Sequence, residues 1–134
     1  MEERRFSAGR LWLVGDDILA VDVTLEGQPT TDQVQEFIAT AQEVIGDRPP
    51  VGLVTMQANS YFFRPETVEY MEEHSDWFDR VAFVVEDVFQ RASIRTFQYA
   101  ARDPRPMHVA ESFDDAIEWL RGAGRDAAIA RKRL

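Results

Sequence analysis

The periodicity of hydrophobic residues changes along this chain in a regular order, and that order constrains the fold more than any other feature. Short apolar or alternating runs, typical of strands, are separated by segments whose apolar residues recur every three or four positions, as in amphipathic helices. The strand-like runs are Gly9–Val14, Ile18–Leu25, Val51–Met56, Arg80–Glu86 and Met107–Ala110. Strands that are separated by helices favour parallel pairs joined by right-handed crossovers.

Capping signals mark the helix boundaries. Thr30 and Gln33 have the spacing of a capping box, and Gly46 is a natural helix end. Further helices are predicted to begin at Pro65, Val88 and Ser112. The element order is then β-β-α-β-α-β-α-β-α. This order predicts an α/β fold with a mostly parallel mixed sheet and one antiparallel strand from an N-terminal hairpin. Residues 1–122 would form a single domain, followed by a basic C-terminal tail over residues 123–134.

Charge is distributed unevenly along the chain, whose net charge is −9. Residues 121–134 hold five basic side chains and one acidic one, so the remainder carries 10 basic and 23 acidic groups. A body this acidic repels phosphate backbones, so we expect no binding of nucleic acid by the domain. The basic tail is interpreted as a solvated helical segment, although it could also contact RNA, an acidic lipid surface or an acidic partner.

The residue inventory excludes several kinds of chemistry. Cysteine is absent, which removes disulfides and thiolate catalysis, and no apolar run is long enough to span a membrane. We therefore expect a cytoplasmic location. His74 and His108 do not belong to metal-binding patterns, and neither a nucleophile elbow nor a glycine-rich phosphate loop is present. We expect no enzymatic activity, no metal and no cofactor.

The predicted helix Val88–Arg102 presents two different faces. Its buried side is expected to consist of Phe89, Ala92, Phe97 and Ala100. Arg91 and Arg95 are four residues apart and would share the other face, which Arg102 could extend. Like charges in a row are mildly unfavourable, so either acids of neighbouring helices or a partner's carboxylate or phosphate would pair with them.

Two segments carry a family resemblance: "DRVAFVVEDVFQRASIRTFQYAARDPRPMHVAES" and the closing "VAESFDDAIEWLRG". Together with the element order, they resemble the STAS domain and, more narrowly, the SpoIIAA-like bacterial proteins that share the fold of anti-sigma factor antagonists. The resemblance extends to about Gly122. It implies a regulatory or protein-interaction module.

In STAS anti-sigma factor antagonists, a serine in a "D-S-S-G-L" segment after the central strand is phosphorylated by a partner kinase. The matching segment here is Phe63-Arg64-Pro65-Glu66-Thr67, which has no serine. Ser60 precedes the junction and Thr67 lies one turn inside the predicted helix. We therefore expect a STAS-type module without the usual phosphorylation switch.

Two interpretations remain for the region after the central strand. As a partner surface, it would comprise Tyr61, Phe62, Phe63, Arg64 and Thr67, with Arg91 and Arg95 nearby. As a ligand mouth, Tyr61–Arg64 would border a pocket for a small apolar molecule, because ligands of open α/β sheets lie at the carboxyl ends of strands. A third reading is self-association, including a homodimer, through an edge strand that contains Trp12 and Leu13.

Overall fold

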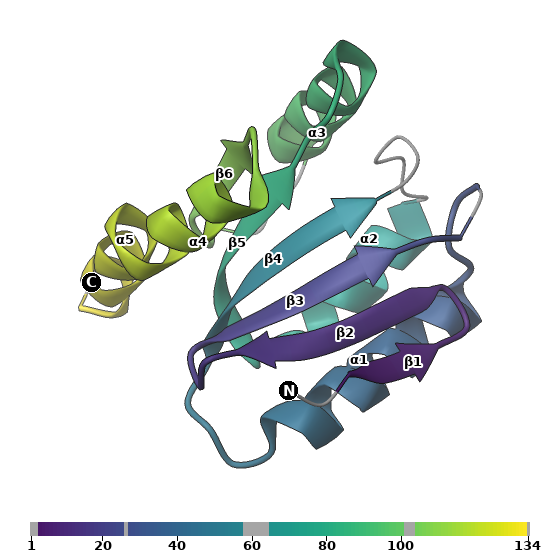
Figure 1. Ribbon diagram of the computed structural model, residues 1–134, viewed down its shortest axis with the longest axis horizontal. Helices are drawn as coiled ribbons and strands as arrows, with labels where there is room; N and C mark the ends of the chain where they lie inside the picture. The colour runs from purple at the N-terminus through teal and green to yellow at the C-terminus, as the bar shows by residue number, and fades with distance from the viewer. Residues whose placement is uncertain (1–2, 26, 58–64, 101–103, 134) are drawn as a thin grey trace.

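The computed structural model describes residues 3–25, 27–57, 65–100 and 104–133 of the chain. They form one mixed sheet with helices on both faces (Figure 1). Among these residues, no helix combines the length and the apolar character that a membrane crossing requires.

Six strands form the sheet, and their spatial order follows the chain. The strands are β1 (Arg4–Phe6), β2 (Gly9–Val14), β3 (Ile18–Val23), β4 (Val51–Gln57), β5 (Phe78–Val84) and β6 (Met107–Ala110). β1, β2 and β3 pair antiparallel, whereas β3 to β6 pair parallel. The predicted α/β class and the mostly parallel sheet are confirmed.

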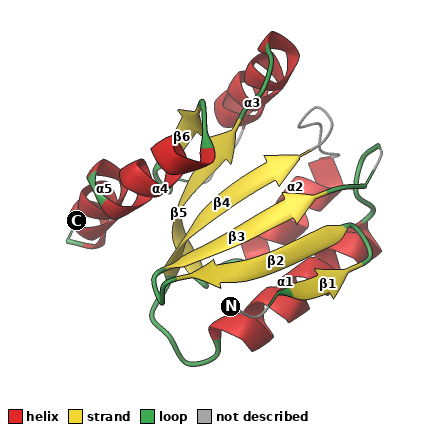
Figure 2. Ribbon diagram, viewed as in Figure 1, coloured by secondary structure: helices red, strands yellow, loops and turns green. Residues whose placement is uncertain are grey.

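Five helices occur in the described parts of the chain. They are α1 (Thr31–Ile45), α2 (Pro65–Glu73), α3 (Val88–Ala100), α4 (Phe113–Arg121) and α5 (Ala123–Lys132). Figure 2 shows α1 and α2 behind the sheet and α4 and α5 in front of it. Because successive crossovers advance in one direction across the sheet, α1 and α2 lie on the same face.

The N-terminal strand β1 was not predicted, because three residues with two arginines carry no strand pattern. It pairs with β2 through Arg4 and Leu11. β2 lies between β1 and β3, but the register of β1 ends at Leu11, short of Trp12 and Leu13, so self-association through this edge stays a prediction. The N-terminal part of the sheet contains two antiparallel pairs instead of one hairpin.

Side chains of the central strands alternate between two cores. On β4, Leu53 belongs to the core under α1 and α2, whereas Val54 belongs to the core under α4. This alternation follows from the period of two along a strand. Phe37 of α1 packs against Phe6 and Trp77 on the first face, with ring centroids 5.6 and 5.8 Å apart.

A buried arginine lies at the amino end of the sheet on the α4 face. Arg80 is only 4% exposed; its Nε donates to the carbonyl of Leu120 at 2.6 Å, and its Nη1 lies 2.7 Å from Oδ1 of Asp79. Gly52 on the neighbouring strand provides the room, since a Cβ there would lie 3.2 Å from Cζ of Arg80. The charge is thus paired, as a buried cation requires.

The residues that were expected to form a basic tail fold into α5, which packs against α4 and β5. Ala128 is buried, and Nζ of Lys132 lies 2.9 Å from Oδ2 of Asp79. The helical character of this segment was anticipated, but its attachment to the sheet was not. A domain boundary at residue 122 stays a prediction.

Candidate functional site

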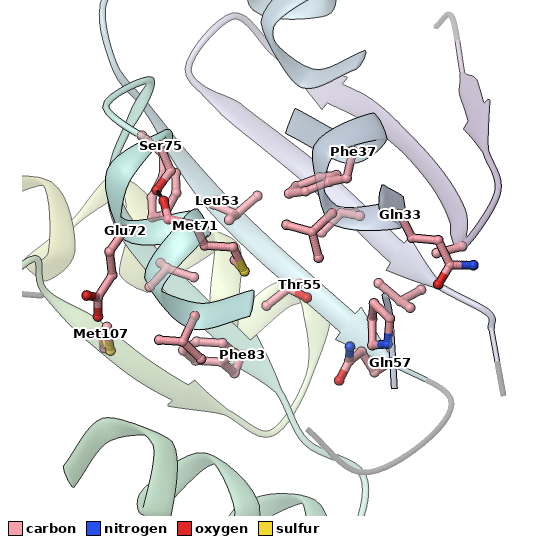
Figure 3. A pocket seen from close by; sticks show the side chains of 18 of the residues that line it. Gln33, Phe37, Leu53, Thr55, Gln57, Met71, Glu72, Ser75, Phe83 and Met107 are labelled. Carbon is pink, nitrogen blue, oxygen red and sulfur yellow. Dashed lines mark hydrogen bonds between the residues drawn. The ribbon is translucent and has the colours of Figure 1, made fainter. Parts of the chain in front are cut away.

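An apolar pocket lies between the sheet and the helices α1 and α2 (Figure 3). Its volume is about 90 Å³. Figure 3 shows Phe37 of α1 and Met71 of α2 on opposite sides of the pocket. Most of the other lining side chains are also hydrophobic, and they include Val21, Val34, Val68, Val81 and Phe83.

The floor of the pocket follows from the alternation along β4. Leu53, Thr55 and Gln57 are two residues apart and therefore point to the same face of the sheet. The floor changes from apolar to polar toward the carboxyl end of the strand. Gln57 is the last residue of β4, so the polar end lies where open α/β sheets commonly hold ligands.

Hydrogen bonds fix the glutamines near this end. Gln33 completes the predicted capping box of α1: its Oε1 accepts from the amide of Thr30 at 2.9 Å, and its own amide donates to Oγ1 of Thr30 at 3.2 Å. The carbonyl of Gln57 accepts from Nε2 of Gln90 at 2.9 Å. The side-chain Oε1 of Gln57 is buried and has no hydrogen-bond partner within the described ranges.

The opposite end of the pocket contains Glu72, Ser75 and Arg105. The guanidinium of Arg105 lies 3.9 Å from the ring centroid of Phe78. Its Nη1 donates to the carbonyls of Ser75 and Phe78, the latter at 3.0 Å. One cation and one anion therefore border an otherwise neutral pocket.

Four of the predicted site residues, Tyr61, Phe62, Phe63 and Arg64, lie outside the described residues. Thr67 is 1% exposed, and its hydroxyl has no hydrogen-bond partner in the described part of the structure. Because the first turn of α2 buries this side chain, Thr67 is not available to a partner protein, and its place in a ligand surface stays a prediction.

The prediction for the buried side of α3 is wrong. Phe89 is 73% exposed and Ala92 is exposed, whereas the buried residues are Gln90, Ser93 and Ile94. Gln90 is drawn inward because its Oε1 accepts from the amide of Glu86 at 2.7 Å while its Nε2 binds Gln57. Phe97 and Ala100 were also predicted on the buried side, but the structure does not describe their side chains.

Of the arginines predicted to share one face of α3, Arg91 has an ion-pair partner in the described structure. Nη2 of Arg91 lies 3.5 Å from Oε1 of Glu111. Arg91 therefore pairs with an acid of this chain, which was one of the two alternatives from the sequence. Arg95 is exposed, and Arg102 lies outside the described residues. Val88, at 71% exposure, joins Phe89 on the surface beside these charges.

The histidines lie away from the pocket. His74 stacks on Tyr70 with centroids 4.2 Å apart, and His108 stacks on Trp119 at 4.9 Å. No cluster of three or more potential metal ligands occurs within the residues that the structure covers. The arrangement of the pocket suits binding of an apolar molecule better than acid–base chemistry.

The sheet order and the helix arrangement define an α/β domain of the STAS type. The sequence model of the SpoIIAA-like family matches residues 20–121, and the chain belongs to this family. STAS-type domains of this kind are commonly regulatory or interaction modules. The resemblance inferred from the sequence is confirmed.

One solved structure with a SpoIIAA-like fold is similar to this chain. It is an uncharacterized protein of the DUF3478 family from Shewanella loihica PV-4, with 17% sequence identity and a TM-score of 0.57. The match covers 82% of this chain and 90% of that chain, and it supports the fold alone. No curated protein matches the sequence.

Proposed function

We propose that this protein is a non-catalytic carrier or sensor that binds a small apolar molecule between α1, α2 and the sheet. The observation that carries the proposal is the apolar cavity of about 90 Å³. A cavity needs only about 10–15 Å³ to hold one water molecule, and protein cores contain few larger voids.

The pocket supports one of the two interpretations of the sequence over the other. Its polar end reaches Gln57, the last described residue before the segment that contains Tyr61–Arg64. A ligand mouth at the carboxyl end of β4 is therefore favoured over a partner surface in this region. A bound molecule would contact α2 directly through Val68 and Met71, so occupancy could be transmitted to the surface of that helix.

The first test is native mass spectrometry of the protein purified from its own host, followed by denaturation of the same sample. An additional mass that disappears on denaturation is expected and would supply the ligand for identification. A mass equal to the bare chain or its multiple would argue against a retained ligand and turn attention to protein partners.

A pair of variants on one strand provides the matched test. Leu53→Phe places a larger side chain in the pocket, and Met56→Phe places the same ring on the opposite face of β4. We expect Leu53→Phe to abolish the additional mass while Met56→Phe retains it. Equal retention in both variants would show that the ligand lies elsewhere.

A second candidate function is a protein-interaction module that uses α3. Val88 and Phe89 are exposed at its N-terminal end, next to the exposed Arg95. Phe89 is 73% exposed, and covering a large apolar side chain with a partner surface is energetically favourable. The two functions are compatible, because these side chains do not line the pocket.

A further inference from the structure

We infer that the exposed side of α3 binds the α3 of a second copy of this chain, with the two helices antiparallel. The inference commits the second candidate function to one partner, and it does not depend on whether the pocket holds a ligand. Five exposed residues form the surface in question, which we call the α3 face: Glu86, Val88, Phe89, Ala92 and Arg95.

The first argument is the exposure of apolar side chains on the α3 face. Val88 and Phe89 are 71% and 73% exposed, and among the large hydrophobic residues that the structure describes only Ile129 is also exposed, at 42%. Val88 and Ala92 are four residues apart and therefore lie along one line of the helix, with Phe89 beside it. A partner that covers this apolar line removes it from water, which is energetically favourable.

The second argument is that the opposite side of α3 is held in place. Gln90, Ser93 and Ile94 are buried. The side chain of Gln90 accepts from the amide of Glu86 and donates to the carbonyl of Gln57. The α3 face is therefore presented in a fixed orientation, which lowers the entropic cost of association. Figure 1 shows α3 at one extremity of the domain, apart from α1, α4 and α5, so a second copy has access to it.

The third argument is the order of charges along the α3 face, which identifies a second copy as the partner. Glu86 lies at its N-terminal end, Phe89 and Ala92 follow, and Arg95 lies at its C-terminal end. In an antiparallel pair, Glu86 of each copy lies at the level of Arg95 of the other. The same twofold axis brings Phe89 opposite Ala92, because both pairs of positions are centred between residues 90 and 91. A small side chain opposite a phenyl ring lets the two helices approach closely.

Both charged groups of the α3 face are available for this contact. Arg95 is exposed and forms no ion pair within the described ranges, whereas Arg91 pairs with an acid of its own chain. Asp87 caps the helix, since its Oδ1 accepts from the amide of Gln90 at 2.8 Å. The exposed Glu86 is therefore the acid at this end that is left for a second copy.

Sedimentation velocity at increasing protein concentration tests the inference. One helix face on each copy buries less area than a standard protein interface, and two copies that each carry a net charge of −9 repel one another. We therefore expect a weak, reversible dimer, seen as a sedimentation coefficient that rises between about 5 and about 500 μM protein.

A pair of variants at exposed apolar residues locates the interface. Phe89→Asp should raise the dissociation constant of the dimer at least about tenfold, because the contact would bury an unpaired carboxylate. Ile129→Asp makes the same kind of change on the exposed surface of α5 and should leave the dissociation constant unchanged. Both side chains are exposed, so both variants should fold.

A charge exchange tests the antiparallel arrangement. In a homodimer of Glu86→Arg or of Arg95→Glu, like charges would lie opposite one another at two symmetric contacts. Each variant alone should therefore raise the dissociation constant about tenfold. An equimolar mixture of the two variants restores opposite charges at both contacts and should recover the dimer.

Each other outcome overturns a defined statement. A dimer that persists equally in Phe89→Asp would overturn the inference and place the interface elsewhere. Failure of the mixed variants to recover the dimer would overturn the antiparallel arrangement. A protein that is monomeric at every concentration would overturn the second copy as partner. In that case, a host protein that co-purifies with the unmodified chain but not with Phe89→Asp would leave the second candidate function intact with a different partner.

Discussion

Arg121 and Asp17, which are 104 residues apart in the chain, form a two-point ion pair that joins the end of α4 to the turn between β2 and β3. Nε and Nη2 of Arg121 donate to the two carboxylate oxygens of Asp17, each at 3.1 Å. Burial acts to raise the pKa of Asp17, but the hydrogen bond and the positive charge of Arg121 together hold this pKa below its ordinary value of 3.8.

The ion pair predicts a defined pH dependence of stability. Because the pKa of Asp17 is lower in the folded state, the stabilisation is complete above pH 3.8 and is lost as the pH falls through the folded value. We expect Arg121→Gln to reduce the free energy of unfolding by up to about 1 kcal/mol at neutral pH, since the pair is partly exposed. Urea unfolding of the unmodified protein and of Arg121→Gln, from neutral pH to below pH 3.8, measures this difference in the free energy of unfolding. If the two proteins still differed by the same free energy of unfolding at the acidic end, the ion pair would not be the source of the stabilisation.

The contact between Gly124 and Trp119 predicts the sign of a glycine substitution. Alanine in a helix normally stabilises by about 1 kcal/mol relative to glycine. A Cβ at Gly124, however, would lie 2.7 to 2.9 Å from three ring carbons of Trp119, whose ring stacks on His108. We expect Gly124→Ala to destabilise by about 1 kcal/mol, because overpacking outweighs propensity. Thermal unfolding followed by circular dichroism measures it. In a Trp119→Leu background the same substitution should stabilise.

The capping box of α1 predicts a local loss of stability. Thr30→Ala removes the side-chain oxygen that accepts from the amide of Gln33. We expect the free energy of unfolding to fall by about 1 kcal/mol, the usual cost of losing such a cap. Thr31→Ala, one position inside the helix, serves as the control and should have a smaller effect. Equal losses in urea unfolding would mean that the cap contributes little.

The exposed side chain of Phe89 separates a partner surface from a structural role. We expect Phe89→Ala to change the free energy of unfolding by no more than about 0.5 kcal/mol, because little buried area is lost. If α3 is a contact surface, proteins that co-purify with the chain from its host should be lost in this variant. Ile129→Ala, an exposed apolar residue on α5, should leave them bound. Equal recovery from both variants would exclude Phe89 from the interface.

The parts of the fold that depend on neighbouring residues could be predicted from the sequence. Thr30 and Gln33 lie on the same turn of a helix, so their spacing alone specified the hydrogen bonds that are observed. Gly46 ends α1 with a φ of 61°, a conformation that favours glycine. Ser112 accepts from the amide of Asp115 at 3.0 Å, as its position before the closing helix indicated.

The parts that depend on distant residues could not be predicted. The pocket combines β3, β4 and β5 with α1 and α2, and the position of Arg105 within it follows from contacts with Ser75 and Phe78. The orientation of α3 depends on Gln90, a polar residue that hydrophobic periodicity assigns to the surface. Its inward position requires the carbonyl of Gln57, 33 residues away in the chain.

The sheet separates two helix layers of different character. On the α4 face, small side chains such as Ala82, Ala110 and Ala116 pack the helix closely onto the strands, while the α1 and α2 face holds the pocket. If α2 opened away from the sheet to admit a ligand, the close packing on the α4 face would not have to be broken. The residence time of a ligand would then be set by this local opening and not by the much slower unfolding of the whole domain.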